Sequence, residues 1–262
     1  MTTPTPAREI DELLSRLVAI VNSDTVLADD ELVRLQWQAR KLLRSDPADA
    51  HTALGIIAAM RLDETTAERE FLRARDDGGW NPFWALNFAT MLGRFHRVEE
   101  ALHQTLDVVQ QGPGPFYVPA LEKTITWAYA VGRLRLVAEI LESLRKHATA
   151  PLPDKTVKLD HGLASLVKAA DELELTDDQI AAIQAPVWAL IREKRITTAG
   201  AVMIEDSVYN DGSLLMNRTF HLPLSFEELL QMEEALVKAQ SEQEDILPIW
   251  NFSVGLQGRE AA

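Results

Sequence analysis

The chain of 262 residues contains no cysteine. This absence excludes disulfides, thiolate metal sites and cysteine nucleophiles, and it is compatible with a reducing cytosol. Long hydrophobic runs are also missing, since no window approaches the roughly 20 apolar residues that a membrane-spanning helix needs. The N-terminus, MTTPTPAREIDELL, lacks a basic segment followed by an apolar run, so we expect no signal peptide. The expected location is cytoplasmic, without a membrane partner.

Standard catalytic motifs are missing as well. The chain has no Gly-x-Ser-x-Gly nucleophile elbow, no Walker A loop and no His-Glu-x-x-His zinc helix. His96, Glu100 and His103 would share a face of one continuous helix, with the Glu-x-x-His spacing of carboxylate-bridged metal sites. Such sites need this motif twice, and no second copy occurs. We therefore predict no metal and no cofactor.

Basic residues are scarce, with 26 Lys and Arg against 40 Asp and Glu, for a net charge of −14. Residues 1–150 hold 17 basic and 21 acidic residues, whereas residues 151–262 hold 9 and 19. An acidic surface repels phosphate backbones, so direct nucleic-acid binding is disfavoured and a basic protein partner is expected. The alternative is that the charge serves solubility alone.

Apolar residues recur at helical spacing from residue 7 to about residue 148, without strand-like alternation. Three segments each open a helix after a short break: Leu62–Ala74, Gly93–Leu106 and Gly132–Leu144. Their apolar positions follow one 4-then-3 spacing, at Ala67, Phe71 and Ala74, at Val98, Leu102 and Thr105, and at Val137, Leu141 and Leu144. This pattern predicts an array of helical hairpins.

The spacing resembles the second helix of tetratricopeptide repeats, over roughly residues 46–148. The first-helix signature of that family, Trp, Leu-Gly and Tyr, is not kept at its spacing, so a general helical solenoid remains the alternative. The resemblance implies a concave groove that binds protein partners, with Asn87 binding a peptide backbone. Trp80 and Trp84 bracket the entrance of a repeat helix, where aromatic anchors can bind a partner. Core packing is the alternative for both.

Ala150–Pro153 coincides with the shift in charge and is the predicted boundary between domains 1–150 and 151–262. After it we expect a helix near residues 155–172. A second helix should start at the capping box of Thr176 and Gln179, and Pro186 should break or kink it. A further capping box, Ser225 with Glu228, opens a helix to about residue 240.

The stretch GAVMIEDSVYNDGSLLMNRTFH at residues 200–221 predicts a β-hairpin around the loop Asn210–Gly212. Its even-numbered face is apolar, and its odd-numbered face carries Glu205, Asn217, Thr219 and His221. Ile249–Val254 predicts a third strand. The expected fold class is mainly α with an α+β part, a helical repeat array followed by a small α-β-β-α-β domain whose sheet is covered on one face.

Glu205 and Asp206 are neighbours in a strand and therefore point to opposite faces, which argues against a paired acid and base. We expect Asp206 opposite Met216, close enough to Arg218 for a structural ion pair. A small polar site at Glu205 and His221 is the alternative to an ordinary solvated sheet face.

The sequence thus favours a protein–protein interaction module, such as an adaptor, a chaperone or a neutraliser of a basic partner. Candidate partner-binding residues are Trp80, Trp84, Asn87, Glu205, Asn217, His221 and Trp250. Two alternatives stay open. One is a hydrolase in which Glu205, Asp206 and His221 converge in a pocket, and the other is a homo-oligomeric structural subunit joined through its last strand.

Overall fold

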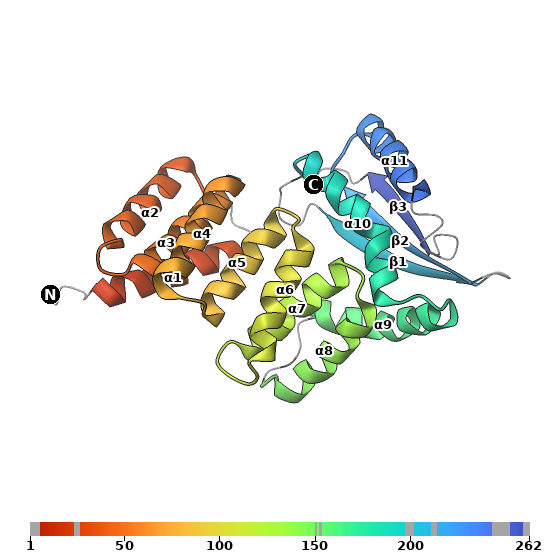
Figure 1. Cartoon of the computed structure of the whole chain (residues 1–262), viewed down its shortest axis with the longest axis horizontal. Helices are drawn as coiled ribbons and strands as arrows, with labels where there is room; N and C mark the ends of the chain where they lie inside the picture. The colour runs from red at the N-terminus through yellow and green to blue at the C-terminus, as the bar shows by residue number, and fades with distance from the viewer. Residues whose placement is uncertain are drawn as a thin grey trace. The chain divides into compact units, whose positions relative to one another are not determined.

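The computed structural model describes residues 6–23, 27–149, 151, 154–196, 202–210, 214–242 and 252–258. These residues form eleven helices and one three-stranded sheet (Figure 1). The predicted fold class, mainly α with a small α+β part, is confirmed. Contacts divide the chain into two compact units, Met1–Phe95 and His96–Ala262. Within the described ranges, no helix is both long and apolar enough to cross a membrane.

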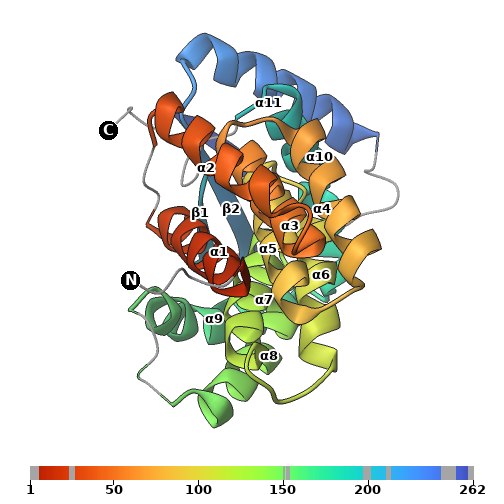
Figure 2. The same cartoon turned by 90° about the vertical axis from the view of Figure 1, so that its left-hand side faces the viewer.

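The first unit is helical throughout its described residues. Its helices are α1 (Pro6–Asn22), α2 (Asp29–Leu42), α3 (Pro47–Met60), α4 (Glu64–Gly78) and α5 (Pro82–Arg94), of which α1 and α2 are drawn in red in Figure 2. The apolar stripes predicted for α1 and α2 are buried, with Leu17 and Leu35 fully enclosed. Each helix therefore turns one apolar face inward, as amphipathic helices of a soluble domain do.

The hairpin of α3 and α4 depends on a close approach between the two helices. A Cβ atom at Gly55 would lie 2.7 Å from Cδ2 of Phe71, so only glycine leaves room for this ring. Phe71 is fully buried, and the small residues Ala67 and Ala74 on either side of it are buried as well. The small-large-small positions predicted for this helix therefore face the core.

The second unit combines helices with the sheet. Its elements are α6 (Val98–Gln110), α7 (Tyr117–Ala130), α8 (Leu134–His147), α9 (Asp154–Glu172), α10 (Asp177–Glu193), β1 (Met203–Asn210), β2 (Leu214–Leu222), α11 (Phe226–Ser241) and β3 (Phe252–Gly258). The two predicted capping boxes are present at the starts of α10 and α11. Of the break or kink expected at Pro186, the break is wrong, because α10 continues through this proline.

Helix starts recur along the chain at nearly constant intervals. Helices α3, α5 and α7 begin at residues 47, 82 and 117, so both steps are 35 residues. Helices α4, α6 and α8 begin at residues 64, 98 and 134, which gives steps of 34 and 36. The residue two before each of these second helices has a left-handed backbone, with φ of 60° at Leu62, 56° at His96 and 81° at Gly132. The same local turn thus recurs in each repeat.

The sheet has the strand order β1-β2-β3, with β1 antiparallel and β3 parallel to the central strand β2. Residues of β2 alternate between buried and half-buried, and the buried even-numbered set includes Met216, Phe220 and Leu222. Helix α10 packs on this face, where the Trp188 ring meets the Phe220 ring edge-on at 5.4 Å between centroids. The predicted apolar face is therefore the one that the helices cover.

The strand register differs from the predicted one by two residues. Asp206 lies opposite Arg218 rather than Met216. The pairing of the two strands also extends as far as Asn210, which lies opposite Leu214. A shift of two residues leaves every side chain on its expected face, because side chains alternate with a period of two. Asn210 therefore belongs to β1 instead of the loop, and residues 211–213 lie outside the described residues. The third strand begins at Phe252, and residues 249–251 of the predicted strand also lie outside them.

The core of the second unit extends across the predicted boundary at residue 150. Leu121 of α7, Leu134 of α8, Ile180 of α10 and Phe220 of β2 belong to one cluster of buried side chains. Residues 96–149 therefore belong to the same compact unit as the α+β part. Whether residues 1–150 and 151–262 fold as separate domains stays a prediction.

Candidate functional site: an acidic groove in the first unit

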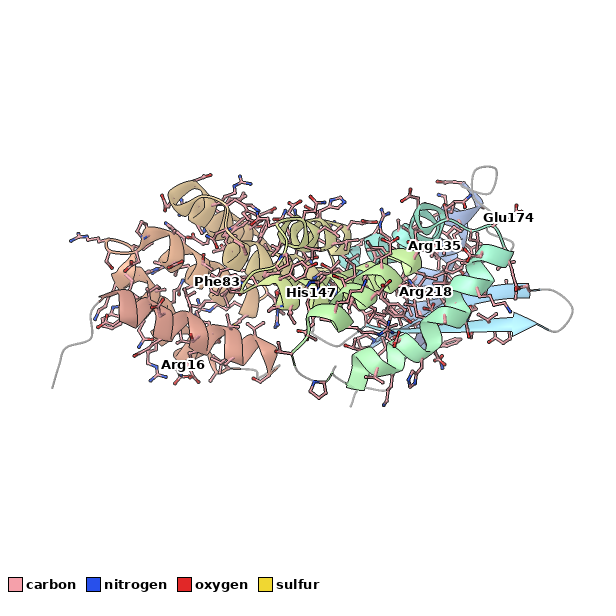
Figure 3. The ribbon with its side chains drawn as sticks, turned by 90° about the horizontal axis from the view of Figure 1, so that it is seen from below. Arg16, Phe83, Arg135, His147, Glu174 and Arg218 are labelled. Atoms are coloured by element: carbon pink, nitrogen blue, oxygen red, sulfur yellow. The ribbon has the colours of Figure 1, made fainter. Side chains whose placement is uncertain are left out.

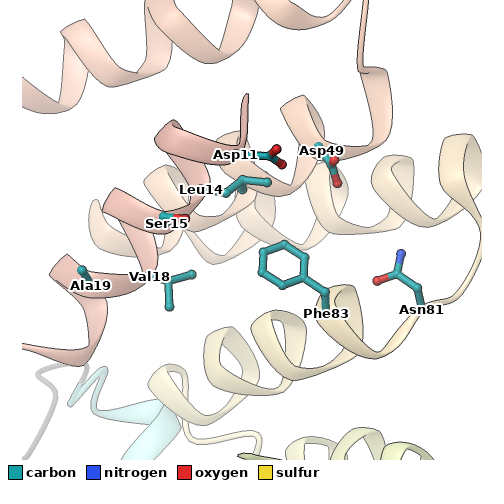
Figure 4. Close-up of a pocket in the computed structure, with 8 residues that line it drawn as sticks. All are labelled: Asp11, Leu14, Ser15, Val18, Ala19, Asp49, Asn81 and Phe83. Atoms are coloured by element: carbon teal, nitrogen blue, oxygen red, sulfur yellow. The ribbon is translucent and has the colours of Figure 1, made fainter. Parts of the chain in front are cut away.

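An open cavity of about 770 Å³ lies among α1, α3 and the start of α5. The residues that line it are Asp11, Leu14, Ser15, Val18, Ala19, Asp49, Asn81 and Phe83 (Figure 4). Its volume falls within the range of typical ligand sites. We call this cavity the acidic groove.

Local structure explains why these side chains meet. The α1 residues at positions 11, 14, 15 and 18 have the spacing that places side chains on one face of a helix. At the start of α5, the Asn81 side chain accepts a hydrogen bond from the Trp84 backbone N–H at 2.9 Å and thereby caps the helix. This cap fixes the first turn of α5, from which Phe83 lines the groove.

The groove has an apolar and an acidic side. Figure 4 shows the Phe83 ring on one side of the cavity, with Leu14 and Val18 facing it from α1. The carboxylates of Asp11 and Asp49 lie together at one end. A ligand with an apolar part and a cationic group would therefore find both complements in one place.

Two carboxylates, Asp11 and Asp49, line this end of the groove, and a third, Asp46, lies near Asp49 without lining the cavity. The pKa of Asp49 is raised, first by burial and then by the negative charges of Asp46 and Asp11. The Oδ2 atom of Asp46 is buried and has no hydrogen-bond partner within the described ranges. Among the described residues, no Lys or Arg forms an ion pair with any of the three. No basic side chain that the structure describes neutralises Asp49, whose charged form burial and its two acidic neighbours disfavour, so a bound cation would stabilise it.

The predicted site residues near the groove lie beside it rather than in it. Trp84 is only 2% exposed, and its Nε1 donates to the Phe71 carbonyl at 2.7 Å, so this tryptophan packs in the core, as the alternative for it had it. Trp80 is half-buried. The Asn87 Nδ2 atom donates to the Phe83 carbonyl at 2.8 Å, one turn earlier in the same helix. The neighbours of these residues, Asn81 and Phe83, are the ones that line the cavity.

On the odd-numbered face of the sheet, the predicted polar residues form two small groups. His221 Nε2 lies 3.0 Å from Glu205 Oε2, and the Glu205 side chain is 70% exposed. Asn217 donates to Thr219 and accepts a hydrogen bond from the hydroxyl group of Ser253 at 2.8 Å. These polar residues face one another across neighbouring strands. Trp250 lies outside the described residues.

Asp206 lies on the other face of the sheet, as the alternation of strand residues predicts. Both of its carboxylate oxygens accept hydrogen bonds from Arg218, at 2.7 Å each, and both side chains are almost completely buried. The Arg218 Nη1 atom also donates to the Tyr129 carbonyl and to Gln184 Oε1. The predicted ion pair is present, and the hydrolase arrangement of Glu205, Asp206 and His221 in one pocket is wrong.

The environment of this ion pair is a closed network. The Arg218 guanidinium lies 4.9 Å from the centre of the Tyr129 ring. The pKa of the Tyr129 hydroxyl is raised, first by burial and then by the Asp206 charge. Gln184 and Trp188 both donate to the Ala130 carbonyl at 3.2 Å. Because the Arg218 guanidinium bonds to Asp206, Gln184 and the Tyr129 carbonyl inside the fold, the pair is a structural element rather than a binding site.

The three residues with metal-like spacing, His96, Glu100 and His103, do not come together on one helical face. His96 lies in the turn before α6, so it does not share a helical face with Glu100 and His103. The His96 Nε2 atom contacts the Ile196 carbonyl, its ring stacks on Trp188, and burial lowers its pKa. Glu100 pairs with Arg97. Within the described ranges, no group of three or more His, Asp or Glu side chains is placed to hold a metal ion.

The fold is thus a helical repeat array continued by a small mixed sheet, and its candidate site is a groove between repeat helices. Among solved structures, the chain is similar to PilF of Pseudomonas aeruginosa, with 20% sequence identity and a TM-score of 0.49. The match covers 74% of this chain and 89% of the PilF chain. No protein-family model matches the chain, and no curated protein matches it in sequence.

Proposed function

We propose that the protein is a protein-interaction module whose acidic groove binds a basic segment of a partner protein. The observation that carries this proposal is the pair of groove-lining carboxylates, Asp11 and Asp49, with Asp46 near Asp49, in an open and partly apolar cavity. A Lys or Arg side chain placed there would neutralise the group, and its aliphatic stem would contact Phe83 and Leu14. Adaptor, chaperone and neutraliser roles are all compatible with binding of such a basic segment.

The repeat geometry supports this proposal. Helix starts 34 to 36 residues apart match the period of about 34 residues that tetratricopeptide repeats have. Helical repeats stack so that one set of helices forms an extended concave surface, and such surfaces bind partners. Helices α1, α3 and α5, which contribute the groove, are alternate helices of the array and would form one such surface.

A peptide array tests the proposal. The labelled full-length protein is incubated with random 12-residue peptides, and the bound set is expected to be enriched in Lys and Arg. The affinity of the best peptide, measured by fluorescence anisotropy, should fall as salt is added, because solvent-exposed ion pairs are screened. The double variant Asp11→Asn with Asp49→Asn should weaken binding by about tenfold or more, equivalent to about 1.4 kcal/mol.

A matched control removes two charges elsewhere. Asp76 of α4 and Asp107 of α6 are exposed and lie outside the groove lining. The double variant Asp76→Asn with Asp107→Asn changes the net charge by the same amount and should bind as the wild type does. Equal loss in both double variants would mean that overall charge, rather than the groove, attracts the peptide. A bound set without enrichment in basic residues would contradict the proposal.

A further inference from the structure

Helix α11 has a second apolar face that the sheet does not cover. Its inner face is in the core through Leu229, Met232 and Leu236. On the outside, Phe226 is 82% exposed, Leu230 46% and Val237 65%. These three residues are spaced by four and seven positions, so they form one line along the helix. The exposed acidic residues Glu227, Glu233 and Glu234 accompany this line.

Helix α2 of the first unit carries an exposed apolar line of the same kind. Val33 is 56% exposed and Trp37 58%, again four positions apart. The charges that α2 itself places beside this line are basic and come from Arg34, Arg40 and Lys41, with the Lys41 Nζ atom 3.3 Å from the centre of the Trp37 ring. Arg34 pairs with Glu31, and Glu9 and Glu12 of α1 lie beside Trp37 and Lys41. The stretch Leu32–Arg44 holds four basic residues and no acidic one, in a chain of net charge −14.

The two exposed faces correspond position by position. Counted from the first apolar residue, Val33 or Phe226, both helices have an apolar residue four positions later. Both carry charges one, seven and eight positions later, and at each of these positions α2 is basic and α11 acidic. Two α11 faces would repel each other, and so would two α2 faces, whereas α2 and α11 are complementary in charge.

We propose that α2 of one copy of the protein docks on the outer face of α11 of a second copy. Trp37 is the expected anchor, because tryptophan and arginine dominate the binding energy of many interfaces. Since the two faces are different surfaces of the same chain, the contact is heterologous, and it links copies head to tail. The contact involves none of the groove-lining residues, so it stands or falls independently of the proposed function.

Charge reversal with mixing tests this contact. One variant carries Arg40→Glu and Lys41→Glu, and the other carries Glu233→Lys and Glu234→Lys. Analytical ultracentrifugation is run on the wild type, on each variant alone and on their 1:1 mixture. The wild type should associate with increasing concentration, each variant alone should associate at least tenfold more weakly, and the mixture should associate again. In the mixture, each reversed face meets an opposite charge on the other variant.

The second variant also separates this contact from general charge effects. It reduces the magnitude of the net charge, so general repulsion alone would make it associate more strongly than the wild type. The proposal expects the opposite. The control Asp107→Lys with Glu139→Lys makes the same change in charge at exposed positions of α6 and α8 and should associate at least as well as the wild type. Circular dichroism verifies that each variant is folded.

Three results would overturn the proposal. A wild type that remains monomeric at about 0.5 mM would exclude a contact of useful strength. Variants that associate as the wild type does would show that other surfaces are responsible. A mixture that stays monomeric would show that the α2 and α11 faces do not meet.

Discussion

Two groups of aspartates in this molecule differ in what surrounds them. In the second unit, Asp206 is buried against Arg218, and a donor of Arg218 that does not reach Asp206 is satisfied by the Tyr129 carbonyl. In the first unit, Asp11 and Asp49 line an open groove and form no ion pair with a Lys or Arg of the described residues. A buried charge with an oppositely charged partner belongs to the fold, whereas a charge beside a cavity without such a partner is available to a ligand.

The same comparison shows that carboxylates adjacent in the sequence need not share a site in the structure. The adjacent carboxylates Glu205 and Asp206 are the more conspicuous pair in the sequence, yet they lie on opposite faces of the sheet. Asp11 and Asp49 come from different helices and are brought together at one cavity. Proximity along the chain is therefore a poor guide to a shared site, because strand alternation separates neighbours and helix packing joins distant residues.

The largest expected effect concerns the boundary at residue 150. A fragment of residues 151–262 lacks the Tyr129 carbonyl and the buried side chains of α7 and α8 that belong to the same core. We expect this fragment not to unfold cooperatively, whereas a fragment of residues 96–262 should show a single transition. Urea denaturation followed by circular dichroism measures both. A cooperative transition in the shorter fragment would instead support the predicted domain of residues 151–262.

The next largest effect comes from breaking the compensated pair. Arg218→Met would leave the buried Asp206 carboxylate without a partner, so the free energy of unfolding should fall by about 3–5 kcal/mol. Urea denaturation of the full chain measures the loss. Adding Asp206→Leu to the same chain should recover part of it, because an apolar pair leaves no buried charge. If the second substitution worsened the loss, the ion pair would not be the cause.

A surface ion pair of the first unit provides the matched control. Arg16 pairs with Glu31, and the Arg16 side chain is 43% exposed. Figure 3 labels Arg16 and Arg218 in the same view. Because water screens the exposed pair, Arg16→Met should change the free energy of unfolding by less than about 1 kcal/mol. Similar losses in the two Arg→Met variants would show that burial does not distinguish the pairs.

Much of the fold could be predicted because its signals are local. The capping boxes at Thr176 and Ser225 follow from residues three positions apart, and the apolar face of β2 follows from alternation. The ion pair of Asp206 with Arg218 could be predicted for the same reason, since a register error of two residues does not change which face a side chain occupies.

The groove could not be predicted, because it depends on how separate helices pack. Asp11 looks like any exposed residue of an amphipathic helix, and Asp49 like an acidic residue in the first turn of α3. The sequence does give one signal, at the entrance of α5. The predicted anchors Trp80 and Trp84 flank a stretch in which Asn81 and Phe83 line the cavity. The boundary at residue 150 illustrates the same limit, since a shift in composition does not reveal which helices share a core.

The smallest expected change in the free energy of unfolding comes from Asp49→Asn. This variant tests most directly whether the groove aspartates differ from Asp206. The raised pKa means that folded Asp49 binds a proton at higher pH than an ordinary aspartate, whose pKa is 3.8. At pH values above the pKa of folded Asp49, its negative charge therefore lowers the free energy of unfolding. This loss disappears as the pH falls through the folded pKa. Because the site is partly solvated, Asp49→Asn should stabilise the protein by only a few tenths of a kcal/mol at neutral pH.

Binding should respond in the opposite direction. A basic peptide requires the ionised Asp49 carboxylate, so its affinity should begin to fall at a pH above the ordinary aspartate pKa, as Asp49 becomes protonated. Thermal denaturation of both proteins and peptide anisotropy across the same pH range measure the two effects. Asp49→Asn should be more stable and bind more weakly. If instead it lost stability and kept its affinity, the carboxylate would serve the fold as Asp206 does, and the difference between the two groups of aspartates would disappear.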